Sequence, residues 1–123
     1  MDTSCSCGGV VTLIFACSGG SNVGQISNEV ARKLTVDNKG AMFCLAGLGG
    51  DVEALVERTR NADRVLVIDG CPVACAKKTL DRHGIECEWL ELTSLGIDKC
   101  PCLELDAEQV ACAMAAAEKC LEG

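Results

Sequence analysis

Four of the eleven cysteines stand at positions from which their thiols could act together. Cys17, Cys44 and Cys71 each follow a short apolar run, and Cys75 comes four residues after Cys71. If the runs are neighbouring strands of one parallel sheet, the loops after them open onto its carboxyl edge, where α/β sheets bind ligands. Four thiolates satisfy a tetrahedral zinc ion, with each sulfur about 2.3 Å from the metal. The cysteines therefore predict a four-thiolate metal site, and zinc is the favoured metal.

The same four thiols suit two other kinds of chemistry. A thiol redox or sulfur-transfer enzyme would use Cys71 or Cys17 as the nucleophile and Cys75 as the resolving thiol. An iron–sulfur protein would hold a cluster on the four thiolates. Helix amino termini after Cys17 and at Cys71 should favour the thiolate form for each of these uses. The sequence leaves open whether the protein is an enzyme, and whether a bound zinc would be structural or reactive.

The apolar pattern predicts strands that alternate with helices. The expected strands are the apolar runs 10–16, 41–44 and 64–69, followed by a half-exposed edge strand over 85–89. The first expected helix runs from a cap at Ser21 or Asn22 to about 34, and the second begins at an Asp51 cap after a glycine loop at 46–50. The third runs from Pro72, capped by Cys71, to about 83. The last covers about 107–121.

This alternation implies a parallel sheet with right-handed crossovers. We predict an α/β fold that is Rossmann-like or flavodoxin-like, with about four parallel strands in a single three-layer domain. The domain is expected over 10–123, after a cysteine-containing tail at 1–9.

Composition and charge disfavour nucleic acid and membranes as partners. The net charge is −7 and the isoelectric point is near 4.6, which disfavours nucleic-acid binding. No apolar run approaches the roughly 20 residues of a membrane span, and the amino terminus lacks the basic start of a signal peptide. We expect a cytoplasmic protein whose cysteines persist as thiols. Protein partners and the oligomeric state are not indicated.

Three strings around the four cysteines resemble a known family. They are Cys17-Ser-Gly-Gly-Ser-Asn-Val-Gly-Gln25, Cys44-Leu-Ala-Gly47 and Asp69-Gly-Cys-Pro-Val-Ala-Cys-Ala-Lys-Lys78. They are similar to the DGC domain, a zinc-binding family named for its Asp-Gly-Cys motif, and the likeness covers roughly 10–99. The resemblance implies that Cys17, Cys44, Cys71 and Cys75 are the candidate chelating residues. It implies no particular reaction.

Other candidate residues are weaker. The pairs Cys5/Cys7 and Cys100/Cys102 could form a second four-sulfur site, although the first pair precedes the first strand and should start at the opposite edge. Asp69 is expected to accept backbone hydrogen bonds or, less favourably, to carry a proton.

His83, the only histidine, is expected on the surface at a helix end. The glycines at 19–24 have P-loop spacing but lack the required Lys and Ser/Thr, which disfavours nucleotide binding.

Overall fold

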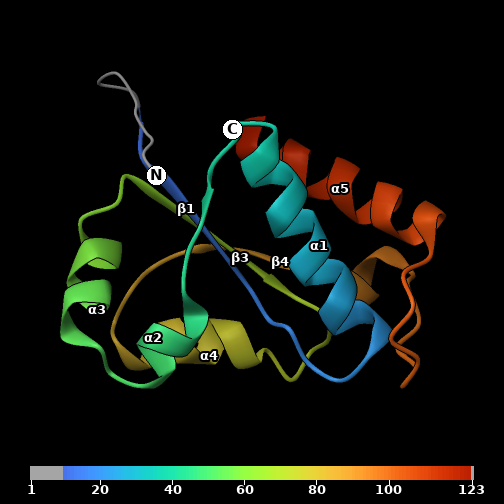
Figure 1. Ribbon diagram of the computed structural model, residues 1–123, viewed down its shortest axis with the longest axis horizontal. Coiled ribbons are helices and arrows are strands. Elements are labelled where there is room, and N and C mark those ends of the chain that lie inside the picture. The colour runs from blue at the N-terminus through green and yellow to red at the C-terminus, as the bar shows by residue number, and fades with distance from the viewer. Residues whose placement is uncertain (1–9, 123) are drawn as a thin grey trace.

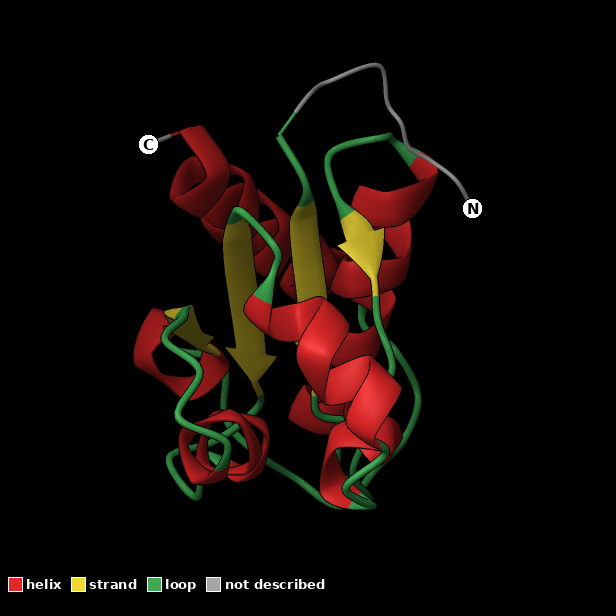
Figure 2. Ribbon diagram, turned by 90° about the vertical axis from the view of Figure 1, so that its left-hand side faces the viewer, coloured by secondary structure: helices red, strands yellow, loops and turns green. Residues whose placement is uncertain are grey.

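The computed structural model describes residues 10–122, and its centre is a sheet of four parallel strands in the order β2-β1-β3-β4 (Figures 1 and 2). The strands are β1 (Thr12–Ala16), β2 (Ala41–Met42), β3 (Arg64–Asp69) and β4 (Glu88–Glu91). This order matches the first four strands of a flavodoxin-like sheet, in which the strand order reverses between β1 and β3. The predicted α/β fold with a four-stranded parallel sheet is confirmed.

Helices cover both faces of the sheet (Figure 1). They are α1 (Asn22–Val36), α2 (Leu45–Gly49), α3 (Glu53–Arg60), α4 (Cys75–Arg82), the short 3₁₀ helix η2 (Leu92–Leu95) and α5 (Ala107–Glu122). Because successive strand residues point to opposite faces, Ile14 and Ala16 pack under α1 and α5, whereas Leu13 and Phe15 face α2, α3 and α4. Both central strands are buried, which explains their continuous apolar sequences.

Gly70 brings β3 close to the first turn of α1. A Cβ atom on Gly70 would lie 2.7 Å from the carbonyl carbon of Val23, so only glycine fits there without a shift. The start of α1 is itself fixed by Ser21, one of the two predicted caps, whose Oγ accepts the Gly24 N–H at 3.1 Å. These contacts set the geometry at the carboxyl ends of β1 and β3.

The segment after β2 differs from the prediction. The glycine-rich stretch at 46–50 was expected to be a loop, but it belongs largely to the short helix α2, which is anchored by the fully buried Leu48. Asp51 does not cap α3; it has a φ of 60°, and Val52 is the N-cap residue instead. The carboxylate of Asp51 pairs with Arg82 at 2.7 Å, across to α4.

Helix α4 begins three residues later than predicted. Cys71 was expected to cap it with Pro72 at its first position, but residues 71–74 form a turn in which the Ala74 N–H bonds to the Cys71 carbonyl at 3.1 Å. Ala74 is left-handed, with φ 60°, and the helix starts at Cys75. The predicted end is confirmed, with Gly84 at φ 70° just beyond it.

The edge strand is also shifted toward the carboxyl end. It was predicted over 85–89 and is observed at Glu88–Glu91. The reason is that the Ile85 N–H bonds to the Leu80 carbonyl at 3.1 Å, so Ile85 closes α4 rather than opening the strand. The predicted final helix is confirmed. None of the helices within residues 10–122 is long and apolar enough to cross a membrane. The predicted tail at 1–9 lies outside the described residues.

Candidate functional site

Cys17 directly follows β1 at the carboxyl edge and lies beside β3. Its N–H continues the ladder to the Ile68 carbonyl at 3.1 Å, and its Sγ accepts the N–H of Gly70, also at 3.1 Å. Ser27 Oγ stands 3.3 Å from the sulfur. The thiol therefore has two hydrogen-bonding neighbours, one on the β3 turn and one on α1.

The surroundings of Cys17 raise its pKa. Burial is the largest cause, the hydrogen bonds from Ser27 and Gly70 oppose it, and the nearby negative charges of Asp69 and Cys71 add to it. The expectation that the start of α1 would favour the thiolate at this position is therefore wrong for the free thiol. The raised pKa favours the protonated thiol at Cys17, and a nearby cation or metal would favour the thiolate.

Ser27 was not among the predicted site residues. It is fully buried on the inner face of α1, and its hydroxyl lies within hydrogen-bond distance of the Cys17 and Gly24 carbonyls. The hydroxyl has one proton, so it can give it to a carbonyl while accepting from the Cys17 thiol, or turn to donate to a thiolate. The signal in the sequence was a serine directly after Ile26, beside the apolar stripe of a predicted helix.

Cys71 lies two residues beyond β3, half-buried against the core under α1 and α5. Lys99 Nζ stands 3.4 Å from its sulfur. Lys99 comes from the loop after η2, which no sequence pattern connected with the four cysteines. Gly70 thus lies between Cys17, to which its N–H donates, and Cys71, the next residue in the chain. The Lys99 ammonium faces the Cys71 sulfur.

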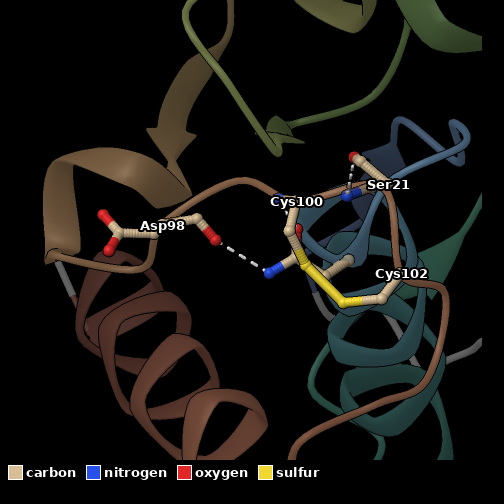
Figure 3. Close-up of a disulfide and its surroundings, with 6 residues drawn as sticks. Ser21, Asp98, Cys100 and Cys102 are labelled. Carbon is tan, nitrogen blue, oxygen red and sulfur yellow. Dashed lines mark hydrogen bonds between the residues drawn. A yellow bond between two sulfur atoms is a disulfide. The ribbon is translucent and has the colours of Figure 1, made fainter.

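The loop that carries Lys99 is fixed by Asn22. We call residues 98–102 the strap. The buried Asn22 side chain donates to the Asp98 carbonyl at 2.8 Å and accepts the Cys100 N–H at 2.7 Å, and its own N–H donates to the Cys100 carbonyl at 3.0 Å. Figure 3 shows the strap beside Ser21 at the start of α1, with the disulfide that joins Cys100 and Cys102.

Asp69 holds the start of α4. The residue is 1% exposed, and its carboxylate accepts the N–H groups of Ala76 at 2.9 Å and Lys77 at 3.0 Å. The same carboxylate accepts Trp89 Nε1–H at 2.9 Å. The predicted role as an acceptor of backbone hydrogen bonds is confirmed. Asp69 replaces the cap side chain that Ala74 lacks, and it thereby positions Cys75.

Cys44 and Cys75 stand at the starts of α2 and α4. Both are exposed; Cys44 is the N-cap residue of α2 and makes no side-chain cap bond. Arg82 and His83 hold the two helices together, through hydrogen bonds to the Leu48 carbonyl at 3.1 and 2.8 Å. The surface position predicted for His83 is wrong, since its side chain is only 13% exposed and packs between the helices.

The structure places all four predicted cysteines after the strands or at the helix starts of one edge, as free thiols. Cys17 and Cys71 are neighbours there. Within residues 10–122, however, no three Cys, His, Asp or Glu side chains converge into a group that would hold a metal as they stand. The donor chemistry fits zinc, and a closed four-thiolate site requires the sulfurs of the exposed Cys44 and Cys75 to join those of Cys17 and Cys71.

The remaining described cysteines are a disulfide-bonded pair, two half-buried thiols and one exposed thiol. Of the possible second four-sulfur site, Cys100 and Cys102 form a disulfide with each other, so the expectation that the cysteines persist as thiols is wrong for this pair; Cys5 and Cys7 lie outside the described residues. Cys87 and Cys120 are half-buried, and burial raises the pKa of both thiols. Cys112 is exposed on α5.

Comparisons with known proteins agree with the motifs. The family model of the DGC domain matches residues 13–117. The chain is 47% identical over 73 residues to the "Anaerobic and virulence modulator AnvM" of Pseudomonas aeruginosa strain PAO1. That alignment covers 59% of this chain and 56% of the relative, so the chain spans a little over half of the relative's length. No solved structure matches the chain.

Proposed function

The chain belongs to the DGC domain family, and from this premise and the edge geometry we propose that it binds one Zn²⁺ through Cys17, Cys44, Cys71 and Cys75. The observation that carries the proposal is the position of the Cys17 sulfur. It lies at the reversal point of the sheet, accepts a main-chain N–H from Gly70 and neighbours Cys71. Ligands of open α/β sheets bind at this point.

The groups around the sulfurs support a charged thiolate site. Four thiolates and one Zn²⁺ carry two net negative charges, which polar groups beyond the ligands must offset. The Gly70 N–H and the Ser27 hydroxyl lie against the Cys17 sulfur, and the Lys99 ammonium faces Cys71. Zinc would also replace the thiol proton that burial retains on Cys17, so binding would release protons.

The two exposed thiols would complete the site. Cys44 and Cys75 begin α2 and α4, which Arg82 and His83 already join at their far ends. Zinc bound by both thiols together with Cys17 and Cys71 would connect these helix starts to the ends of β1 and β3. Four protein sulfurs fill the tetrahedral sphere of zinc, which favours a structural or regulatory role over catalysis. Reduced thiols of this kind require a reducing compartment such as the cytoplasm.

The test is the metal content of the full chain purified without oxygen. We expect about one zinc per chain, as a tetrahedral four-thiolate site requires. Single serine substitutions at each of the four cysteines should lower the zinc content and weaken its retention against a chelator. Cys112→Ser and Cys87→Ser, which alter free thiols outside the proposed site, are the matched controls and should retain the metal.

Other outcomes would assign a different chemistry. Iron with an equal amount of acid-labile sulfide would overturn the zinc proposal in favour of an iron–sulfur cluster. No metal, together with a reversible disulfide between Cys71 and Cys75, would favour a thiol redox or sulfur-transfer enzyme. Zinc that survives all four substitutions would place the metal elsewhere.

A further inference from the structure

The disulfide on the strap lies at the same edge as the four predicted cysteines. Lys99 Nζ reaches the Cys71 sulfur at 3.4 Å, and the next residue along the chain is Cys100. The Cys100 main chain bonds to Asn22, the first residue of α1 and close to the end of β1. From this placement we propose that Cys100 and Cys102 form a reversible thiol–disulfide exchange site, which reacts with low-molecular-weight thiols and their disulfides.

A structural role explains this disulfide poorly. It joins residues two apart in sequence, and closing so short a loop restricts the unfolded chain very little. The strap is already fixed by the three hydrogen bonds between Asn22 and the main chain of Asp98 and Cys100. These bonds use no sulfur atom, so they persist whether the pair is oxidised or reduced.

The exposure of the two cysteines sets the direction of attack. Cys102 is exposed and Cys100 is half-buried, so an incoming small thiol reaches the Cys102 sulfur first. Cys100 is then the leaving group. Its main chain lies at the amino terminus of α1, a 15-residue helix whose positive dipole end favours a departing thiolate.

The exchange balances with two small thiols. A small thiolate attacks Cys102 Sγ, forms a mixed disulfide and releases Cys100 as a thiolate, which takes up a proton. A second small thiolate then attacks the small thiol's sulfur in that mixed disulfide, and Cys102 leaves as a thiolate and is protonated. Two electrons pass to the protein, and two small thiols become one small disulfide. Oxidation by the small disulfide is the reverse sequence.

The test is equilibration of the full chain with mixtures of reduced and oxidised glutathione, followed by acid quenching, alkylation and tryptic digestion. Cleavage after Lys99 and Lys119 gives one peptide, residues 100–119, which contains Cys100, Cys102 and Cys112. It should carry one alkyl group when the pair is oxidised and three when it is reduced. We expect a single two-electron transition, complete over about a hundredfold span of [GSH]²/[GSSG].

Substitutions make the assignment specific. Cys112→Ser should lower both counts by one without moving the transition. Cys102→Ser should leave Cys100 to form a mixed disulfide with glutathione, and circular dichroism checks that this variant folds. Zinc content is measured on the same variant and should be unchanged, so failure of the exchange and failure of the zinc proposal are distinguishable. A peptide with one alkyl group at every ratio, or three at every ratio, would overturn the proposal.

Discussion

Asp69 is the buried charge on which the start of α4 depends, and Asp69→Asn tests how much it contributes. The carboxylate accepts three hydrogen bonds, from the Ala76 and Lys77 N–H groups and from Trp89 Nε1. An asparagine retains one acceptor oxygen and turns an NH₂ group toward the remaining donors. Hydrogen bonds to a charged group contribute about 1.5–3 kcal/mol each, so the loss of two sets an upper range of about 3–6 kcal/mol.

Water reduces this loss, because the Trp89 side chain is partly exposed and the Lys77 N–H lies in the first turn of a helix. We therefore expect Asp69→Asn to lower the free energy of unfolding by about 2–3 kcal/mol at neutral pH. For a chain of this size that corresponds to a fall of about 6–15 °C in the midpoint of thermal unfolding.

The assay is guanidinium unfolding followed by far-ultraviolet circular dichroism, since Trp89 fluorescence would report the local contact and not only the fold. Asp81→Asn is the matched control: it removes an exposed carboxylate from α4 whose partner is the solvated Lys77. We expect it to change stability little. If Asp69→Asn unfolds at the same denaturant concentration as the wild type, the buried carboxylate does not determine where α4 starts.

Two further outcomes follow from close packing and burial. Gly70→Ala should destabilise the fold by about 1–3 kcal/mol, because its Cβ would lie 2.7 Å from the Val23 carbonyl carbon. Gly19→Ala is the control and should not destabilise the fold, because the space around its Cβ is open. Thermal unfolding measures both variants. At pH 8, Cys120 should react with iodoacetamide more slowly than the exposed Cys112, because burial raises the Cys120 pKa and reduces its thiolate fraction. Equal rates, read by mass spectrometry, would contradict this reasoning.

The sheet could be predicted because each central strand has a recognisable local sequence pattern. The run Arg64–Asp69 is apolar and β-branched, and it forms β3 with the predicted ends. The cap at Ser21 could be predicted because an N-cap serine bonds within the first turn of its own helix, so the signal is also local. The common edge of Cys17, Cys44 and Cys71 followed from the alternation of strands and helices.

The parts that could not be predicted depend on side-chain contacts between different elements. Asp69, at the end of β3, fixes the start of α4 across the turn at 71–74, so the local interpretation of Pro72 as the first helical residue was wrong. The strap reaches the edge only because Asn22, far away in sequence, bonds to it. The sequence offered Cys100 and Cys102 only as part of a disfavoured second metal site, whereas in the fold Cys100 bonds to Asn22 and the neighbouring Lys99 lies beside Cys71.

Lys99 is the described contact between the strap and the proposed zinc ligands, so Lys99→Met can test whether the strap supports the metal. The ammonium lies 3.4 Å from the Cys71 sulfur and is exposed to solvent, which screens part of its attraction. We expect Lys99→Met to weaken zinc binding by up to about tenfold, at the lower end of the losses seen when a group that supports a metal ligand is removed. Competition with a chelator measures the affinity, and Lys119→Met, an exposed lysine on α5, is the control. The Asn22 side chain bonds to the main chain of the strap, not to Lys99. The substitution should therefore leave the redox transition of Cys100 and Cys102 unchanged. Unchanged zinc affinity would mean that the ammonium does not stabilise a charged sulfur at Cys71.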